Sequence, residues 1–487
     1  AAVAAQLVFA PLPAVTDPER AMADGAPQLY DELKNNIALR WGHKQGDVDA
    51  AFQNAPVTVK QRIRNHRVAG IPMETRGVVA MPDSMTSGLT FWTSTQAPHW
   101  NRRDVAEMLG LGQHEVRAIA PQVGGGFGVK IGSYPEDFIL SAIAHHLKRP
   151  VKWIETRTEN FQATHQGRDQ IADIEVAADK DGKILGYRLH IIQDQGAYPK
   201  DTSLAILTAT MAVGCYDIPA IEITALGACT NTLDGGAYRG AGRPEAAYFI
   251  ERAIDLVADA TGVDPAEVRR RNFIRPEQFP YTTPTGARYD SGNYGAALDV
   301  ALEKAGYADL RRQQQEARQQ GRYLGIGLAS YLEICGFGPW ESSTVRVEPT
   351  GDVIIYSGLM PQGQGQETTF AQLGGDSLGA DSDGVTVHSG DTATTPQGNG
   401  TMGSRGLSVG GSAVMLSLNK LRDKARRIAA VLLEASADDI ELVNGRYQVK
   451  GAPDRSASLA QIAAAAYGSR LPVEIEPGLF SMVFFRP

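Results

Sequence analysis

The stretch Gln362-Gly-Gln-Gly-Gln-Glu-Thr-Thr-Phe370 decides how this chain is interpreted, together with Gly398-Asn-Gly-Thr-Met-Gly-Ser-Arg405 and Gly124-Gly-Gly-Phe-Gly-Val-Lys130. Each is dense in glycine, and the first two also carry amide or hydroxyl side chains. Glycine lets backbone N–H groups approach a ligand closely and turn toward it. A fourth stretch, Gly235-Gly-Ala-Tyr-Arg-Gly-Ala-Gly-Arg-Pro-Glu245, adds two arginines. Together they predict a cradle for a large, phosphate-bearing organic cofactor.

The bulk composition is that of a folded protein with several domains. The chain has 487 residues, which corresponds to roughly three domains of ordinary size. With 43% hydrophobic and 21% charged residues it has a globular composition. The formal net charge of −8 argues against a nucleic-acid-binding protein, because such proteins present a basic face. The sequence has no run of about 18 apolar residues, so we expect no membrane span.

The three cysteines limit the metal chemistry of the chain itself. Cys215, Cys229 and Cys335 form no C-x-x-C pair. This excludes a four-cysteine zinc site or an iron–sulfur cluster made from this chain alone. A disulfide framework is not expected either, and the composition fits a reducing compartment. We therefore expect a cytoplasmic protein.

Hydrophobic periodicity and turn residues predict an α+β fold. The expected helices are residues 101–110, 134–147, 244–261, 366–377 and 409–434. The expected strands are residues 57–60, 88–93, 116–120, 151–155 and 385–388, with hairpins around residues 179–183, 349–352 and 444–445. Residues 265–322 are helical and charged, which is typical of a solvated face.

The ends of the sequence suggest a fragment of something longer. Residues 1–10 are interpreted as a last strand, and residues 11–17 continue as a linker. Residues 480–487 form an apolar, strand-like run. A change of domain is expected near residues 320–330.

Taken singly, each glycine-rich stretch has a plain structural interpretation. The pattern Gly398-x-Gly400-x-x-Gly403 lacks the strand that must precede a dinucleotide-binding loop, so we reject that fold. Lys130 is spaced wrongly for a phosphate P-loop, and residues 124–128 alone could be a tight strand-to-helix crossing. Arg239 and Arg243 precede a helix, where guanidinium groups and the helix N-terminus both favour anions. There is no G-x-S-x-G elbow, and hydrolase chemistry has no support.

Five motifs in order resemble one family, the molybdenum hydroxylases of the xanthine dehydrogenase, aldehyde oxidase and aerobic carbon monoxide dehydrogenase type. The likeness is to the large, molybdopterin-binding subunit and runs along nearly the whole chain. The motifs are Ser94-Thr-Gln-Ala-Pro98, Gly124-Gly-Gly-Phe-Gly128, Ala237-Tyr-Arg-Gly-Ala-Gly-Arg243, Gln362-Gly-Gln-Gly-Gln-Glu-Thr-Thr369 and Gly400-Thr-Met-Gly-Ser-Arg405. The resemblance implies an elongated, multi-domain subunit with mixed sheets and flanking helices.

The resemblance also implies a division of the sequence. Residues 1–55 would be a linker and the remnant of a first domain. Residues 56–322 would form a first molybdopterin-binding region with substrate-side loops. Residues 323–487 would form a second molybdopterin-binding region.

Individual roles follow from the same resemblance. Gln96 looks like the glutamine that hydrogen-bonds an oxygen ligand of molybdenum, and the Gly126–Phe127 peptide looks like the loop facing the metal's oxo group. Arg239 is similar to an arginine beside the substrate pocket. The catalytic set is therefore Gln96, Phe127 and Arg239. The implied cofactor-binding residues are Gly125, Gly126, Phe127, Gly128, Arg239, Gln362, Gly363, Gln364, Gly365, Thr401, Gly403 and Ser404.

The implied cofactor is molybdopterin cytosine dinucleotide with molybdenum, held through its own sulfurs, so the chain supplies no metal ligand. FAD and 2Fe-2S clusters are expected on partners: an FAD-binding medium subunit and a 2Fe-2S small subunit. The implied assembly is a dimer of heterotrimers. The implied reaction is hydroxylation of a small-molecule substrate, an aldehyde or an N-heteroaromatic compound.

Two departures from the family pattern matter. The family's catalytic glutamate lies in a C-terminal Gly-Glu segment that this sequence does not contain, so the base is expected on other sequence or on a second polypeptide. Copper-containing carbon monoxide dehydrogenases carry cysteine where this chain has Gly240. Hydroxylation is therefore favoured over carbon monoxide oxidation, which stays an alternative, as does an inactive cofactor-binding or assembly module.

Overall fold

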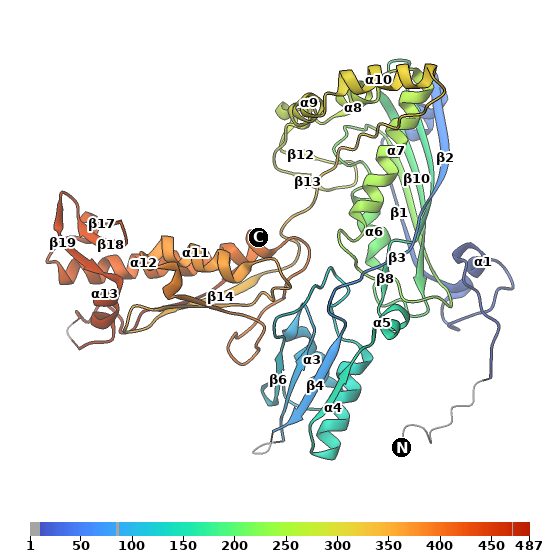
Figure 1. The fold of residues 1–487 in the computed structure, drawn as a ribbon. Coiled ribbons are helices and arrows are strands. Elements are labelled where there is room, and N and C mark those ends of the chain that lie inside the picture. Colours follow the sequence, from blue (N-terminus) through green and yellow to red (C-terminus); the bar gives the residue numbers. More distant parts are fainter. Residues whose placement is uncertain (1–9, 84–86, 470) are drawn as a thin grey trace. The chain divides into compact units, whose positions relative to one another are not determined.

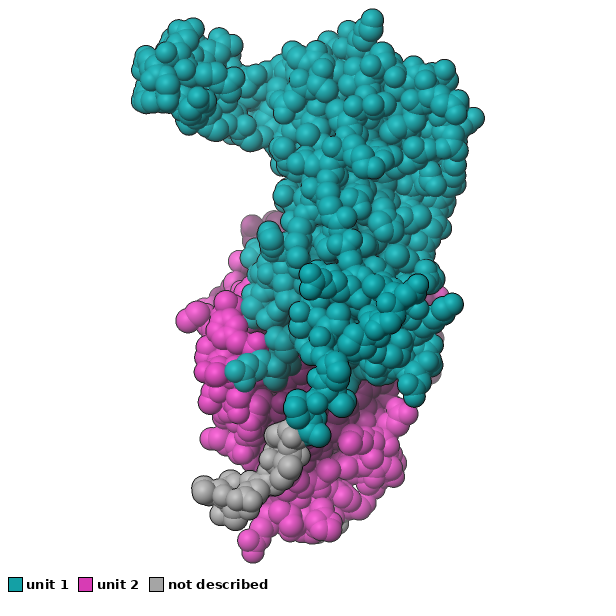
Figure 2. All heavy atoms as spheres, turned by 90° about the vertical axis from the view of Figure 1, so that its right-hand side faces the viewer, with its two compact units in different colours: residues 1–70, 162–333 teal, residues 71–161, 334–487 magenta. Residues whose placement is uncertain are grey.

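The computed structural model describes residues 10–83, 87–469 and 471–487. They form two compact units, each built from two separate stretches of the chain (Figure 2). Unit 1 comprises residues 1–70 and 162–333, and unit 2 comprises residues 71–161 and 334–487. These units divide the chain differently from the consecutive segments 1–55, 56–322 and 323–487. The assignment of those segments to cofactor binding stays a prediction.

Unit 1 is built on a five-stranded sheet with the order β1-β11-β10-β9-β2 (Figure 1). Its strands are β1 (Ile37–Gln45), β2 (Val57–Asn65), β9 (Gln170–Ala178), β10 (Ile184–Gly196) and β11 (Ile221–Cys229). Neighbours pair antiparallel except β10 and β11, which are parallel. One buried core joins the sheet to its helices, which are α6 (Ser203–Thr210), α7 (Arg243–Thr261) and α8 (Pro265–Asn272).

The predicted hairpin between β9 and β10 is confirmed. Asp179 Oδ1 accepts hydrogen bonds from the backbone N–H of Asp181 (2.8 Å) and of Lys183 (2.9 Å). Gly182 adopts a φ of +83°, which glycine tolerates at no steric cost. This turn fixes the register that places buried Tyr187 opposite buried Val176.

Residues 1–55, expected to be a linker and the remnant of a first domain, include regular secondary structure of unit 1. Ile37–Gln45 is the edge strand β1, and Val48–Asn54 is helix α2. Most side chains of β1 are only half-buried, so it lacks the apolar alternation by which strands are recognised. The strand expected at residues 1–10 lies, but for residue 10, outside the described residues.

The rest of unit 1 consists of short elements and a helical arm. They are α1 (Pro18–Met22), β3 (Val68–Ala69), α5 (Arg157–Ala163, ending in this unit), β8 (Gln166–Gly167), β12 (Tyr281–Thr282), β13 (Arg288–Tyr289), α9 (Tyr294–Ala305) and α10 (Tyr307–Gln319). The helices within residues 265–322 agree with the sequence prediction. None of the described helices of the chain is both long and apolar enough to cross a membrane.

Unit 2 contains two four-stranded sheets, the first with the order β6-β5-β4-β7. Its strands are β4 (Gly77–Pro82), β5 (Leu89–Thr93), β6 (Val116–Ile119) and β7 (Val151–Ile154). The helices α3 (Pro98–Leu109) and α4 (Pro135–Leu147) contribute to its core. Each begins with proline at its first turn, where the missing N–H costs nothing.

The second sheet of unit 2 has the order β16-β15-β14-β20. Figure 1 labels its strand β14. Its strands are β14 (Glu341–Val347), β15 (Val353–Ser357), β16 (Val385–His388) and β20 (Phe480–Phe485). The helices packed in its core are α11 (Gln366–Leu378), α12 (Ser412–Leu432) and α13 (Leu459–Ala466). A small sheet follows, made of β17 (Ile440–Val443), β18 (Arg446–Val449) and β19 (Ala452–Ser458).

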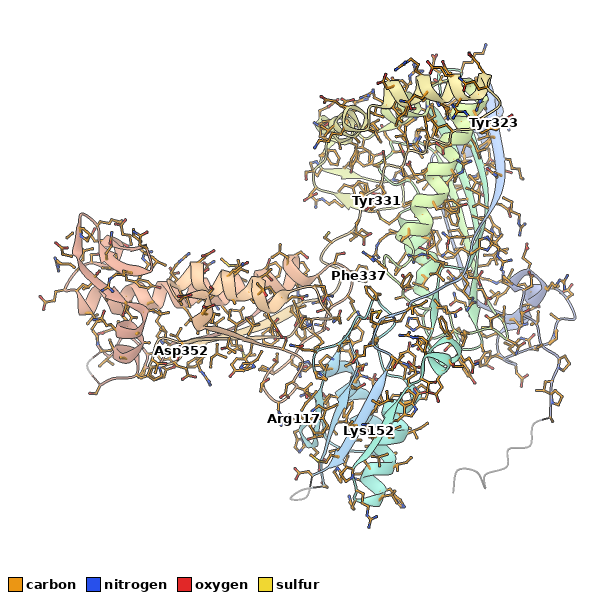
Figure 3. All side chains as sticks on the ribbon, viewed as in Figure 1. Arg117, Lys152, Tyr323, Tyr331, Phe337 and Asp352 are labelled. Carbon is orange, nitrogen blue, oxygen red and sulfur yellow. The ribbon has the colours of Figure 1, made fainter. Side chains whose placement is uncertain are left out.

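Backbone hydrogen bonds tie the two stretches of unit 2 together. Ile119 forms a bridge with Asp391, and Ala120 N donates to the carbonyl of Gly390 (2.7 Å). Arg117, labelled in Figure 3 on the first sheet, forms an ion pair with Asp391. Residues about 270 positions apart therefore share one folded unit.

His99 links the same two stretches. Its Nε2 lies 2.9 Å from the carbonyl oxygen of Thr395, and its side chain is buried. Burial lowers the pKa of His99 from 6.5 to about 4. The unfolded chain takes up a proton below pH 6.5 that the folded chain binds only near pH 4. Stability is therefore full above pH 6.5 and falls as the pH drops through this window.

We expect the His99→Gln variant to lose this acid sensitivity. Glutamine can still donate to Thr395 but does not titrate. In the wild-type chain the buried histidine accounts for about 2 kcal/mol of unfolding free energy lost between pH 7 and pH 5. Urea denaturation at the two pH values measures the difference, with exposed His146→Gln on α4 as the matched control. An equal acid-induced loss in wild type and His99→Gln would contradict the assignment.

Candidate functional site

The glycine-rich loop at residues 124–128 is forced into its shape by backbone geometry. Gly125 and Gly128 adopt φ values of +98° and +99°, and Phe127 between them adopts +56°. Only glycine adopts such values routinely. Phe127 stands at the loop with 45% of its surface exposed. The loop therefore holds an aromatic side chain in an unusual backbone conformation, which is common where a site is built.

Gln96 is buried and bonds this loop through its amide oxygen. Its Oε1 accepts hydrogen bonds from the backbone N–H of Gly128 (2.9 Å) and of Lys130 (3.3 Å). A Cβ on Gly126 would lie 2.6 Å from the same oxygen, so only glycine permits the approach. The Nε2 donates to the carbonyl of Thr401 (2.8 Å). An amide nitrogen has two hydrogens, so one N–H is left to donate elsewhere.

The loop at residues 400–404 meets Gln96 through its backbone. Thr401 N donates to the carbonyl of Gln96 (3.1 Å), and the Thr401 hydroxyl accepts from Met360 N (3.0 Å). Gly403 has a φ of +60°, and a Cβ there would lie 2.5 Å from the Cβ of Phe337, which Figure 3 labels. Ser404 has a φ of +54°. Two of the predicted motifs thus meet at Gln96, which belongs to a third.

A buried ion pair between Glu341 and Arg405 contacts the loop at residues 398–405. Glu341 accepts from the backbone N–H of Asn399 (3.2 Å), and Arg405 lies 3.4 Å from the same carboxylate. Both side chains are almost fully buried. Burial raises the pKa of Glu341 to about 7, while Arg405 opposes the shift. Sequence inspection missed Glu341, because it lies in a strand far from the loop in the chain.

The loop at residues 362–365 is stabilised by hydrogen bonds between its own two glutamines, and its glycines have open space around them. Gln362 N donates to Oε1 of Gln364 (2.6 Å), and Gln364 Nε2 donates back to Oε1 of Gln362 (2.9 Å). Gly363 and Gly365 have φ values of +107° and +81°. A Cβ on either would find no heavy atom within 4 Å among the described residues beyond its chain neighbours. These glycines let the backbone adopt positive φ values, and they line an open hollow.

That space is a hollow of about 460 Å³ at the start of α11. Gly365 is the N-cap of α11, and no described side chain caps the helix, so its first N–H groups remain available. Gln366 lines the hollow, is buried, and its Oε1 has no hydrogen-bond partner among the described residues. The opposite wall includes Pro121 and Val123. This wall was not identified from the sequence, because it carries no distinctive side chain.

Arg239 lies in unit 1, in the loop before α7. Arg168 donates to the carbonyl oxygens of Tyr238 (2.7 Å) and Arg239 (2.6 Å), and so grips the loop backbone. The Arg239 guanidinium makes no hydrogen bond or ion pair with any described residue of unit 1. Arg243, by contrast, pairs with Glu333 at 2.8 Å. Of the two predicted anion-binding arginines, only Arg239 has a guanidinium without an ion-pair partner among the described residues of unit 1.

Two segments of the chain match the same kind of domain model. Residues 29–273 and residues 300–485 each match a molybdopterin cofactor-binding domain. The chain belongs to the molybdenum hydroxylase family, as a molybdopterin-binding large subunit. The family and the mixed-sheet fold predicted from the sequence are thereby confirmed. The roles of the individual site residues stay predictions.

Three known proteins illustrate the likeness. The carbon monoxide dehydrogenase large chain of Afipia carboxidovorans is 39% identical, with 98% of this chain and 63% of that protein covered. The nicotine 6-hydroxylase large subunit of Paenarthrobacter nicotinovorans is 37% identical, with 96% and 59% covered. The crystal structure of quinoline 2-oxidoreductase from Pseudomonas putida 86 is 32% identical, with 99% and 63% covered and a TM-score of 0.93. The chain thus spans about three fifths of the length of these relatives.

Proposed function

We propose that this chain is the cofactor-binding part of a molybdenum hydroxylase that oxidises an aldehyde or an N-heteroaromatic compound, with water as the oxygen source. The observation that carries this proposal is the convergence of three glycine-rich loops within unit 2. Gln96 bonds the first loop through Gly128 and the second through Thr401. Met360, just before the third loop, bonds Thr401. Relatives that hydroxylate nicotine and oxidise quinoline support the substrate class.

The residues of unit 2 fit the proposed cofactor, molybdopterin cytosine dinucleotide. The uncapped start of α11 and the open backbone at Gly363 and Gly365 offer N–H donors, which suit a diphosphate. The orphaned Oε1 of Gln366 offers an acceptor in the same hollow. A volume of about 460 Å³ falls in the range of ligand and cofactor pockets.

When bound, the cofactor supplies the redox-active metal, which the chain itself need not ligate. The chain's residues bind, orient and exclude water. We assign the free N–H of Gln96 and the amides of Gly126 and Phe127 to the metal-facing side, as neutral donors. Gln362 and Gln364 brace the pterin-side loop, with Thr401, Gly403 and Ser404 opposite. Arg239, with its uncommitted guanidinium, is proposed for the substrate side.

The proposal includes partners beyond this chain. Electrons would pass to a 2Fe-2S small subunit and an FAD-binding medium subunit, in a dimer of heterotrimers located in the cytoplasm. A relative named as subunit gamma of a dehydrogenase complex supports a multi-subunit assembly.

Carbon monoxide oxidation is the second candidate, because a carbon monoxide dehydrogenase large chain is 39% identical. The loop at Gly240 disfavours it. Gly240 has a φ of +98°, and a Cβ there would lie 2.6 Å from Cδ of Pro244. A cysteine could replace Gly240 only if the loop moved, so this position does not suit a copper thiolate.

The experiment compares two glycine-to-alanine variants. Gly363→Ala and Gly451→Ala both replace a glycine of positive φ that has no described neighbour near its Cβ. Both changes introduce backbone strain at a positive φ, which is +107° at Gly363 and +76° at Gly451, and this strain is of order 1–3 kcal/mol. Only Gly363→Ala alters the proposed cradle, so we expect it to lower bound molybdenum and acid-released cytidine monophosphate at least roughly tenfold in the assembled complex.

The Gly451→Ala complex should keep its molybdenum and nucleotide at the wild-type level. Equal cofactor content in both variants would exclude the hollow as the binding site. Full cofactor content in the wild-type complex, with no turnover of any aldehyde or heteroaromatic compound, would favour an inactive binding or assembly module. Carbon monoxide oxidation by the same complex after copper loading would favour the second candidate.

A further inference from the structure

An ion pair between Glu74 and the buried Lys130 fastens both ends of the 124–130 loop. Glu74 Oε2 accepts from the backbone N–H of Gly124 (2.8 Å), and Glu74 N donates to the carbonyl of Gly124 (3.1 Å). Lys130 Nζ donates to the same Oε2 (2.7 Å) and to the Glu74 carbonyl (3.0 Å). One residue on a separate segment therefore holds the first and the last residue of the loop.

The fit around Glu74 is close. A Cβ on Gly124 would lie 2.5 Å from the Cβ of Glu74, so this glycine is required for the contact. The Ser94 hydroxyl lies 3.3 Å from the other carboxylate oxygen of Glu74. The segments around residues 74, 94 and 124 thus meet at one carboxylate, next to the strand end that carries Gln96.

Lys130 is buried more deeply than stability alone would favour. Its side chain is 1% exposed, whereas that of Glu74 is 36% exposed. Burial lowers the pKa of Lys130, and Glu74 opposes that shift. A buried ion pair seldom stabilises a fold more than apolar side chains of the same volume would, although it can fix one conformation. The backbone of Lys130 is itself held by Gln96, whose N–H donates to the Lys130 carbonyl (2.9 Å).

We propose that Glu74 and Lys130 are positioning residues. They form a clamp that sets the distance between the ends of the 124–130 loop, and thereby the direction of Phe127 and of the loop amides. This inference rests on the proposed function, because the clamp acts on the loop assigned to the metal-facing side. Neither side chain needs to contact substrate or cofactor for this role.

The test uses the double variant Glu74→Gln/Lys130→Met in the full chain. A single change would leave a charge without its partner and could prevent folding, whereas the double variant removes both charges. The amide oxygen introduced by Glu74→Gln can still accept from Gly124 N, but the ammonium bridge to residue 130 is lost. The matched control is Glu251→Gln/Arg269→Met, which removes another buried pair (2.8 Å) in unit 1.

We expect hydrogen–deuterium exchange of the amides of residues 124–130 to rise at least roughly tenfold in the double variant, with the core strands of unit 2 unchanged. In the assembled complex we expect kcat to fall roughly tenfold while KM and bound molybdenum stay at wild-type levels. The conservative Lys130→Arg variant, which keeps a donor to Glu74, should retain much of the exchange protection.

Three results would overturn the clamp. They are unchanged exchange at residues 124–130, exchange that rises equally throughout unit 2, and the same local effect in the control. The exchange measurement needs no cofactor. A wild-type complex without molybdenum would therefore refute the proposed function, while the clamp would still be decided by the exchange data.

Discussion

The Gly400→Ala variant should unfold far more easily than the wild-type protein. Gly400 has a φ of +80°, and a Cβ there would collide with the carbonyl oxygen of Gln96 and lie 2.8 Å from the Cα of Ala97. Both neighbours are backbone, which cannot swing aside as a side chain can. The 96–97 and 400–401 segments would have to separate, which breaks the hydrogen bonds between Gln96 and Thr401.

Backbone strain, overlap and lost buried hydrogen bonds together predict a loss of about 3–5 kcal/mol. For a unit of this size that corresponds to a melting temperature lower by roughly 10 °C, measured by calorimetry. The control is Gly132→Ala in the same unit. Gly132 has a φ of +76°, but its Cβ would have no heavy atom within 4 Å among the described residues. Similar melting temperatures for the two variants would show that the junction at Gln96 does not hold the unit together.

The sequence predicted elements best where local signals mark both ends. The helix expected at residues 134–147 is α4 (Pro135–Leu147), and the one expected at 366–377 is α11 (Gln366–Leu378). Proline at the first turn marks the start of α4, and Gly379 after the last turn marks the end of α11. The turn at Asn444–Gly445, with φ values of +47° and +74°, is equally local and was also predicted.

The interleaving of the two units could not be read from the sequence. Residues 71–161 pack with residues 334–487, although 172 residues of unit 1 lie between them. The contacts responsible, such as Ala120 with Gly390, are backbone hydrogen bonds that carry no residue preference. Strand β20 likewise pairs with β14, more than 130 residues earlier in the chain. The apolar sequence of β20 does not indicate which strand it pairs with.

The candidate site shows the same division between local and distant signals. The glycines of the three loops were recognised because a run of glycine has a local conformational meaning. The side chains that hold those loops were not recognised. Glu74 acts on Gly124, and Glu341 acts on Asn399, 50 and 58 positions away in sequence. The sequence around a single glutamate in a strand or a turn does not indicate that its side chain will bond a distant loop.

Gln96→Leu should abolish most of the function while the chain still folds. Leucine matches the volume of glutamine approximately but removes the acceptor for Gly128 N and the donor to the carbonyl of Thr401. Each buried backbone group left without a partner costs about 1–3 kcal/mol. We therefore expect a destabilisation of about 3 kcal/mol, since the longer bond to Lys130 N (3.3 Å) contributes less.

The effect on turnover should be larger than the effect on stability. One N–H of Gln96 has no acceptor among the described residues, and it is the donor proposed to orient a ligand of the metal. Removal of one such donor costs about 10²–10³ in kcat. Turnover per bound molybdenum in the assembled complex is the decisive quantity, because it corrects for lost cofactor. The control is Gln113→Leu, which changes the same side chain at an exposed position. Turnover per molybdenum within a factor of about three of wild type would leave Gln96 only its structural role, since the loss of a donor that acts in the reaction has a larger effect on kcat.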